Sequence, residues 1–400
     1  MSDSTPFERG IDRGVDPAES VVRRYAPALR LPEEHAPEED FRALLEKCSI
    51  AEGIRWFPLC TFEGVAIDVL DETSRMRTGT LKSIDGCVTT AACLARRYAR
   101  IVFETGGNTG MALAAYGQRA GLETFCVVPE ENVALLDSRV FAHGSTRLIA
   151  VGDPAMVRPT AERLSERYDV PRVPRPTWRH LASRFRGSFV LEQLLRGERW
   201  THFVQTISAA FGPIGIYDAL NGHDVPTPTF IGVQQAENCA MFTAWRAGSP
   251  DVRTRPVRST AALLSPVMYD ARPQTYGTFE RLSNLLARTS GRLTTLDHDG
   301  FERLLDEHPV GRELLSCLAD RGVTITCRDG RIVERTGLMA ILGALDEVDN
   351  GRIARGSRVL VALTSGAGTS DGRAVPHLRL NELSMLDACA DQRWFGNGRG

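Results

Sequence analysis

Two features of the chain have residue types suited to covalent chemistry on a small molecule: Lys82 and the turn TGGNTG at residues 105–110. The turn follows a short apolar run, residues 101–103, which predicts a buried strand, and it precedes a stretch suited to a helix. Backbone N–H groups at such a helix start point into the turn. The pattern therefore predicts a site for an anion such as a carboxylate or a phosphate.

Lysine is scarce in this chain, which makes Lys82 conspicuous. Only Lys47 and Lys82 occur, against 46 arginines. Arginine stays charged and cannot form a Schiff base, whereas a desolvated lysine can. A lysine retained beside an anion-binding turn is therefore a candidate for chemistry that arginine cannot perform.

Composition excludes several classes of partner. The 400 residues carry a net charge of −2, with 42% hydrophobic and 24% charged residues, which is typical of a soluble globular protein. The arginines are interspersed with acidic residues, so we expect no nucleic-acid partner. No apolar run reaches the roughly 18 residues of a membrane helix, so we expect no membrane partner.

Cysteine usage and the first residues favour a reducing cytoplasm. The nine cysteines are odd in number and scattered, and none forms a C-x-x-C pair, so we expect neither disulfides nor a metal site. The start of the chain has no basic segment followed by an apolar segment, and we therefore expect cytoplasmic localisation.

The pattern of apolar residues predicts strands alternating with helices, and hence an α/β fold. In the first half we expect strands at 101–104, 124–128 and 146–151 and helices at 84–100, 110–120, 132–142 and 154–167. In the second half we expect strands at 202–207, 229–235 and 358–363 and helices at 189–196, 214–220, 280–288, 300–306, 311–320 and 338–347.

Other segments lack such periodicity. Residues 1–40 are predicted to form an arm or a loosely packed extension. Residues 170–188, rich in proline and arginine, are predicted to cross between domains; Arg184 and Arg186 there could bind an anion, but a solvated face is the stronger expectation. Residues 248–280 are predicted to be irregular.

Three small-residue turns, at 105–110, 208–215 and 364–368, fall at strand ends, where open α/β sheets bind ligands. Together with Lys82, their order and spacing resemble the fold-type II pyridoxal-phosphate enzymes, the group of threonine synthase, cysteine synthase and cysteate synthase. The resemblance covers residues 55–370.

Within that group the chain is most similar to cysteate synthase. TGTLKS around Lys82 resembles its lysine motif, and VQQAENCAMFTAW resembles its segment that ends in Ala-Trp. RPQTYG, from Arg272 to Gly277, resembles its Arg-to-Tyr-Gly turn. ERTGLMAILGAL, residues 334–345, resembles the helix before its last strand.

The resemblance implies two open, mostly parallel twisted sheets with helices on both faces. It also implies a domain division: an N-terminal extension at 1–50, a large cofactor-binding domain at 51–84 and 186–390, a small domain with the asparagine turn at 85–185, and a flexible tail at 391–400.

The resemblance further implies pyridoxal 5'-phosphate as cofactor, no metal, and a role for each site residue. Lys82 would form the Schiff base and carry the proton at Cα. The cofactor would be bound by Asn108 at the phenolate oxygen, by Ser208, Ala209, Ala210, Phe211 and Gly212 at the phosphate, and by Ser365 or Thr364 at the pyridine nitrogen. The substrate would be bound by Thr105, Gly106, Gly107, Thr109, Arg272 and Tyr276.

One turn departs from the pattern of the group. Its phosphate turn is usually rich in glycine, whereas this chain has Ser208-Ala209-Ala210-Phe211-Gly212. Glycine permits positive φ angles and a close approach of the backbone, and Ala210 and Phe211 make both harder. A weaker or shifted phosphate site is the expectation.

The predicted activity is β-elimination or β-replacement on an amino acid with a leaving group, first of all the reaction of O-phosphoserine with sulfite in a homodimeric enzyme. Alternatives are threonine synthase-like replacement, serine or threonine dehydration, and a non-catalytic ligand-binding relative. A nucleotide-dependent oxidoreductase is a distant further alternative, because the chain lacks a Walker loop and a G-x-G-x-x-G fingerprint.

Overall fold

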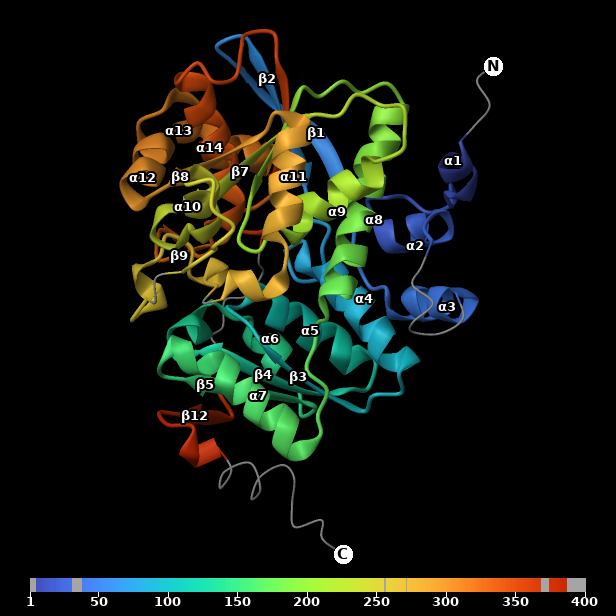
Figure 1. Cartoon of the computed structure of the whole chain (residues 1–400), viewed down its shortest axis with the longest axis vertical. Helices are drawn as coiled ribbons and strands as arrows, with labels where there is room; N and C mark the ends of the chain where they lie inside the picture. Colours follow the sequence, from blue (N-terminus) through green and yellow to red (C-terminus); the bar gives the residue numbers. More distant parts are fainter. Residues whose placement is uncertain (1–4, 31–37, 255–256, 271, 368–373, 387–400) are drawn as a thin grey trace, which may run out of the picture.

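The computed structural model describes residues 5–30, 38–254, 257–270, 272–367 and 374–386. The predicted tail at 391–400, Cys389 and Gly368 of the last turn lie outside these residues. Two sheets, each flanked by helices, form the two lobes of Figure 1. This confirms the predicted α/β fold class.

The larger sheet has six strands in the order β1-β2-β11-β6-β7-β8. Its strands are β1 Arg55–Phe62, β2 Val65–Asp71, β6 His202–Thr206, β7 Thr229–Gln235, β8 Arg292–Leu296 and β11 Arg358–Leu363. Only β1 runs antiparallel to its neighbour; the other pairs are parallel. Parallel β6 and β11 are adjacent, so the turns that follow them emerge side by side at one edge.

The smaller sheet has four parallel strands in the order β12-β5-β4-β3. They are β3 Arg100–Glu104, β4 Glu123–Pro129, β5 Thr146–Val151 and β12 Leu378–Leu380. Residues 378–380 fall within the range that the sequence assigned to the large domain. Because β12 pairs with β5 at the edge of the smaller sheet, that part of the assignment is wrong (Figure 1).

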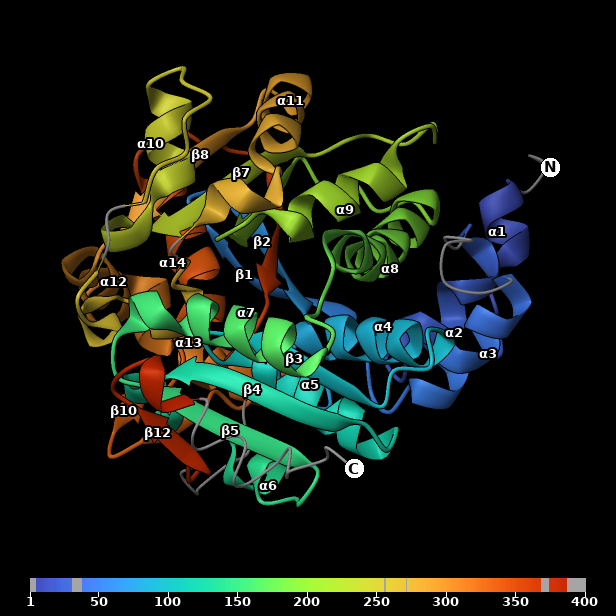
Figure 2. The ribbon, with the colours of Figure 1, turned by 60° about the horizontal axis from the view of Figure 1, so that its bottom comes forward.

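Helices cover both faces of both sheets. In chain order they are α1 Pro6–Gly10, α2 Val21–Tyr25, α3 Glu38–Cys48, α4 Lys82–Ala95, α5 Asn108–Arg119, α6 Ser138–Phe141, α7 Val157–Tyr168, α8 Pro176–Leu195, α9 Phe211–Leu220, α10 Ala240–Arg246, α11 Phe279–Thr289, α12 His298–Asp306, α13 Pro309–Asp320 and α14 Thr336–Asp349. A hairpin of β9 Cys327–Arg328 and β10 Arg331–Ile332 precedes α14. In Figure 2, α7 lies on one face of the smaller sheet and α5 and α6 lie on the other.

The alternation of strand side chains explains why both faces are covered. In β11, Leu360 and Ala362 belong to the apolar core shared with α8, α9 and α11. Val359, Val361 and Leu363 belong to the core shared with α12, α13 and α14. From Val359 to Leu363 every residue of β11 is apolar, so the strand must be buried on both sides, as is usual for parallel sheets.

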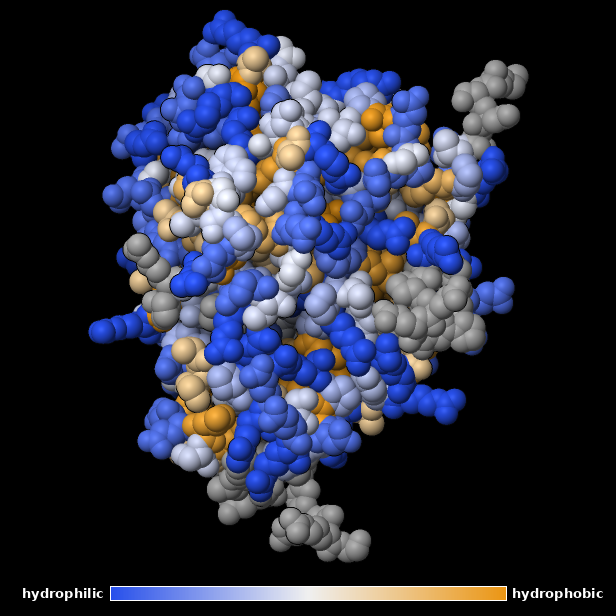
Figure 3. Space-filling model, in the orientation of Figure 1, coloured by the Kyte–Doolittle hydropathy of each residue, from blue (hydrophilic) through white to orange (hydrophobic). Residues whose placement is uncertain are grey.

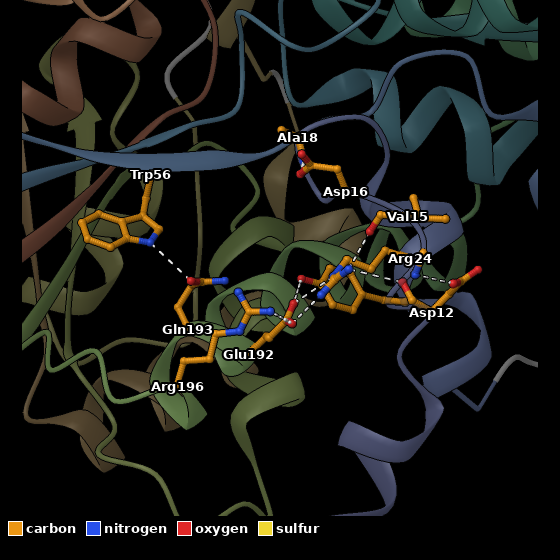
Figure 4. A network of polar contacts seen from close by, with 11 residues as sticks. Asp12, Val15, Asp16, Ala18, Arg24, Trp56, Glu192, Gln193 and Arg196 are labelled. Carbon is orange, nitrogen blue, oxygen red and sulfur yellow. Dashed lines mark hydrogen bonds and ion pairs between the residues drawn. The ribbon is translucent and has the colours of Figure 1, made fainter.

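The N-terminal segment differs from its prediction as a loosely packed arm. Val21, Val22 and Tyr25 are fully buried. Buried Arg24 donates to both carboxylate oxygens of Glu192 on α8, at 3.0 and 2.6 Å, and the Tyr25 hydroxyl donates to the same carboxylate at 2.6 Å. Figure 4 shows this network between α2 and α8. The described residues 5–30 are therefore part of the packed structure.

Segment 170–188 was predicted only as a crossing between domains, and no helix was predicted in it. Its second half begins α8, a helix of 20 residues that starts at Pro176, where a proline costs no intrahelical hydrogen bond. The prediction of a helix at 189–196 captured only the end of α8. Sequence periodicity missed the helix because nearly all of it from Phe185 to Leu194 is buried, which removes the contrast between an apolar and a polar face.

Other differences concern short or edge elements. The sequence did not predict β1, β2, β8 or β12. The expected helix at 132–142 is a 3₁₀ helix, Glu130–Leu135, followed by the short α6. Residues 248–280 contain short 3₁₀ helices, Thr260–Ala262, Pro266–Met268 and Pro273–Tyr276, before α11 begins at Phe279, which agrees with the irregular structure expected there. Further 3₁₀ helices are Ala26–Ala28, Pro154–Met156 and Ala236–Asn238.

Surface properties agree with the composition. No helix among the described residues is long and apolar enough to cross a membrane. Hydrophilic side chains cover most of the face drawn in Figure 3, with apolar side chains scattered between them.

Candidate active site

Lys82 is the first residue of α4, and its position is fixed by the end of β11. The N–H of Leu81 donates to the carbonyl oxygen of Thr364 at 2.9 Å. The N–H of Lys82 donates to the hydroxyl of Thr80 at 3.1 Å. The backbone before Lys82 is thereby attached to the turn that follows β11.

The Lys82 ammonium group is partly withdrawn from water. Its Nζ atom lies 2.9 Å from Oδ2 of Asp85, one turn along α4, and the two side chains are 27% and 5% exposed. Burial lowers the pKa of Lys82. The positive charges of Arg179 and Arg186 lower this pKa further, whereas Asp85 opposes the shift. A lysine with a lowered pKa reaches its neutral, nucleophilic form closer to neutral pH.

The turn after β3 is organised by Thr105. Its hydroxyl oxygen accepts from the N–H groups of Gly107 at 2.9 Å and of Gly110 at 3.1 Å. Those two N–H groups are therefore bound within the turn itself. Asn108, predicted within the turn, is the first residue of α5.

The other predicted site residues border one cavity of about 210 Å³, whereas Gly107 does not. Its φ of 153° is open to glycine and strained for other residues. A Cβ atom there would lie 2.9 Å from a methyl carbon of Val267. The role of Gly107 is to shape the turn against the segment that carries Val267.

The turn after β6 contains an alanine in the conformation expected of glycine. Ala210 has φ 57° and ψ 16°, in the left-handed region, and it directly precedes α9. The sequence indicated that Ala210 would make a positive φ harder, but the turn adopts it nevertheless. Such a conformation costs an L-residue about 1–2 kcal/mol, so the surrounding structure imposes it.

The turn after β11 contributes two buried hydroxyl groups. Thr364 and Ser365 are 3% and 2% exposed. The Oγ atom of Ser365 has no hydrogen-bond partner among the described residues. A buried hydroxyl without a partner is costly in a folded protein, so this atom is a candidate ligand contact.

Tertiary folding brings the predicted residues to one cavity of about 210 Å³. The predicted residues that border it are Lys82, Thr105, Gly106, Asn108, Thr109, Ser208, Ala209, Ala210, Phe211, Gly212, Arg272, Tyr276, Thr364 and Ser365. They come from five separate parts of the chain. Their individual roles stay predictions.

The cavity is rich in positive charge. Among the described residues, the cationic side chains on its border are Lys82, Arg158, Arg179, Arg186 and Arg272, and the carboxylates are Glu104 and Asp270. The guanidinium carbon of Arg179 lies 5.3 Å from the ring centre of Phe211 and 5.8 Å from that of Tyr276. An excess of arginines over carboxylates favours an anionic ligand.

Burial raises the pKa of two residues near these arginines, Asp270 and Tyr276. It raises the pKa of Asp270, against the opposing effects of the Arg272 N–H, Arg179 and Arg158. It also raises the pKa of Tyr276 to about 12, so this phenol keeps its proton at neutral pH and can donate a hydrogen bond.

Sequence reasoning missed several residues of this cavity. Arg158 and Arg179 were hidden among many arginines. Asp85, which contacts Lys82 but does not border the cavity, is recognisable only as the residue one turn after Lys82. Arg186 was expected on a solvated face, but it is 1% exposed and borders the cavity. Arg184 instead donates to the carbonyl oxygen of Arg30, away from the cavity.

The matching family defines the class of this protein. A family model described as pyridoxal-phosphate dependent enzyme matches residues 53–280, more than half of the chain. The chain belongs to this family, and pyridoxal 5'-phosphate is the cofactor that the family uses. No curated protein compared with the chain matches it.

Solved structures share the fold at low sequence identity. Threonine synthase from Escherichia coli has a TM-score of 0.64 at 13% identity, covering 95% of this chain and 89% of its own. Threonine deaminase isoform 2 from Solanum lycopersicum has a TM-score of 0.58 at 16% identity, covering 92% of each chain. O-ureido-L-serine synthase has a TM-score of 0.56 at 16% identity, covering 81% of this chain and 91% of its own.

The cavity residues fit this cofactor. Lys82 supplies an amine for the aldehyde, and Ser365 supplies an unpaired buried hydroxyl suited to the pyridine nitrogen. A Cβ atom on Gly212 would lie 2.6 Å from Nη1 of Arg186, so glycine alone leaves the start of α9 open there. The amine, the hydroxyl and the helix N-terminus on the cavity border suit the aldehyde, the pyridine nitrogen and the phosphate of the cofactor, respectively.

Proposed function

We propose that the protein catalyses a β-replacement, in which O-phosphoserine and a small nucleophile such as sulfite yield a new amino acid and phosphate. The observation that carries this proposal is the location of Lys82 in a cavity bordered by four arginines. The lysine supports chemistry at Cα, and the arginines support a substrate with an anionic group besides its carboxylate.

The bound cofactor supplies an electron sink for the negative charge that develops at Cα. Lys82, as a neutral amine, would take the proton from Cα. The bond between Cβ and the phosphate oxygen then breaks and phosphate leaves with the electron pair. A bond from the nucleophile to Cβ follows, and Lys82 returns its proton to Cα.

The turn after β3 would orient the substrate carboxylate. Thr105 keeps its hydroxyl proton for donation, because its oxygen accepts from the turn itself. Free N–H groups at the start of α5 add to this site. Ser365, a neutral hydroxyl, would leave the pyridine nitrogen without a proton, which favours elimination and replacement over transamination.

Three of the arginines that border the cavity, Arg158, Arg179 and Arg272, would bind the leaving group. Arg158 and Arg179 lie on different helices, and Arg272 begins the segment that carries Tyr276. Guanidinium groups bind phosphate through paired N–H donors, which suits departure of a phosphate dianion. Serine or threonine dehydration needs no such cations and is therefore the less supported alternative.

Threonine synthase-like replacement remains the second candidate, because an O-phosphohomoserine-type substrate would use the same arginines. The two candidates differ in the distance between the carboxylate and the phosphate of the substrate. We further propose a cytoplasmic homodimer; the eight described cysteines are free, which supports a reducing compartment.

The first experiment asks whether the cofactor is attached at Lys82. The purified protein is examined for violet absorption, reduced with borohydride and digested, and a modified peptide containing Lys82 is expected. Phosphate release is then measured with O-phosphoserine, O-phosphohomoserine, serine and threonine, each with and without sulfite. Absence of a label at Lys82 would reject the proposal. Release of phosphate from O-phosphoserine without incorporation of sulfite would reject sulfite as the nucleophile.

A further inference from the structure

Arg186 on α8 is a buried arginine with one unused nitrogen. Its Nε atom donates to Oε1 of Glu72 at 2.6 Å, and its Nη2 atom donates to Oε2 of Glu72 at 2.5 Å and to Oε1 of Gln205 at 3.0 Å. The Arg186 and Glu72 side chains are 1% and 0% exposed. The Nη1 atom is buried and has no hydrogen-bond partner among the described residues.

The unused nitrogen points at the turn after β6. A Cβ atom placed on Gly212 would lie 2.6 Å from Nη1, so the nitrogen is next to the first turn of α9. That helix has 10 residues, and its first N–H groups have no partners within the helix. Helix N–H groups and a guanidinium N–H thus converge at one place on the cavity border.

This convergence meets the requirements of a phosphate. A helix N-terminus favours a dianion, and a charged N–H donor strengthens its binding. A buried donor without a partner is costly, and the cost is removed when a ligand oxygen accepts from it. The charge of Arg186 is already balanced by Glu72, so the site does not require a free buried cation when empty of ligand.

Glu72 has a defined position at the edge of the sheet. It follows β2, and its N–H donates to the carbonyl oxygen of Leu363 at 3.1 Å, at the end of β11. The bidentate contact then fixes the plane of the guanidinium group. Glu72 is therefore a positioning residue, which acts only through Arg186.

We propose that Arg186, held by Glu72, binds the phosphate group of the cofactor together with the first N–H groups of α9. Its guanidinium supplies a donor that compensates for the alanine and phenylalanine in a turn where glycines would let the backbone approach. This inference rests on the proposed function for the identity of the phosphate compound, whereas the anion site itself does not.

The test compares two ligands that differ only in the phosphate. Binding of pyridoxal 5'-phosphate and of pyridoxal to the cofactor-free protein is titrated by absorbance and fluorescence. Because Arg186→Gln alone leaves Glu72 buried without a partner, the main variant is the double substitution Arg186→Gln with Glu72→Gln. Arg184→Gln is the matched control, because it removes an arginine from the same helix outside the cavity.

We expect the double variant to bind pyridoxal 5'-phosphate about 10- to 100-fold more weakly, as for loss of one charged hydrogen bond, and to bind pyridoxal as the wild type does. Inorganic phosphate should compete with pyridoxal 5'-phosphate in the wild type and less in the variant. Arg184→Gln should change none of these. An unchanged affinity for pyridoxal 5'-phosphate, or an equal loss for both ligands, overturns the inference.

Failure of the proposed function gives a different result. A wild-type protein that is labelled at Lys82, with variants that retain their affinity, overturns only the role of Arg186. A wild-type protein that binds inorganic phosphate in an Arg186-dependent manner but is not labelled at Lys82 retains the anion site and loses the proposed function. Unfolding curves of all variants verify that each is folded.

Discussion

The Nζ atom of Lys82 lies 2.9 Å from Oδ2 of Asp85, which is 5% exposed. Asp85 stabilises the ammonium form of the lysine, while burial and the arginines Arg179 and Arg186 favour the neutral amine. The balance between these effects sets the pH at which Lys82 becomes reactive.

Asp85→Asn should shift the reactivity of Lys82 to lower pH. Without the carboxylate the main effect that opposes burial of the ammonium group is lost, so the pKa of Lys82 falls further. The rate of borohydride-trapped cofactor attachment, measured from pH 6 to 9, should reach half its maximum at lower pH. Asp85→Glu, which keeps the carboxylate, is the control, and a shift to higher pH would contradict this account.

Ser365→Ala should separate activity from stability. The Ser365 hydroxyl has no partner among the described residues, so its removal should leave the free energy of unfolding unchanged or raise it by less than about 1 kcal/mol. Turnover should fall about tenfold if the hydroxyl contacts the cofactor ring. Thr90→Val is a matched control: Oγ1 of Thr90 is also buried without a partner, but it lies outside the cavity. Equal turnover in both variants would exclude the cofactor contact.

Ala210→Gly should stabilise the protein without its cofactor. Ala210 has a φ of 57°, and glycine relieves about 1–2 kcal/mol of backbone strain while it costs about 0.4–1 kcal/mol through the unfolded chain. Urea unfolding should therefore show a net gain of at most about 1.6 kcal/mol. Ala209→Gly, at the preceding residue without a positive φ, should instead lose stability. A loss in both variants would indicate that Ala210 is not strained.

Arg179→Gln should weaken the binding of phosphorylated substrates. The KM for O-phosphoserine should rise about tenfold, because one charged contact to the leaving group is lost, while kinetics with serine should change little. Arg175→Gln, at the exposed N-cap position just before the same helix, serves as control. A similar rise of KM for serine would assign Arg179 to packing against Phe211 and Tyr276 instead.

Arg24→Ala should destabilise the whole protein, although Arg24 does not border the cavity. The substitution leaves the buried Glu192 carboxylate without its bidentate partner, which costs about 3–5 kcal/mol. Arg23→Ala is the control, since its side chain is 38% exposed and its contact to Glu19 is 3.7 Å long, and it should change stability by less than about 0.5 kcal/mol. Similar unfolding midpoints for the two variants would contradict a structural role for the N-terminal segment.

The sequence by itself determined most of the alternating strands and helices and the small-residue turns between them. Apolar runs such as 101–103 and 358–363 are local signals, because burial on both faces requires apolar residues at successive strand positions. The scarcity of lysine directed attention to Lys82, and the small residues of TGGNTG predicted a turn at a helix start. These inferences needed no knowledge of distant contacts.

Tertiary structure alone decided how these elements meet. Arg186 and Glu72 are 114 residues apart, and no local pattern distinguishes this arginine from half-buried Arg184 on the same helix, which lies outside the cavity. Likewise, the positive φ of Ala210, the pairing of β12 with β5 and the contact of Arg24 with Glu192 depend on packing between distant segments. Periodicity predicts which face of an element is buried, but which distant side chain meets it there is decided only when the sheets and helices assemble.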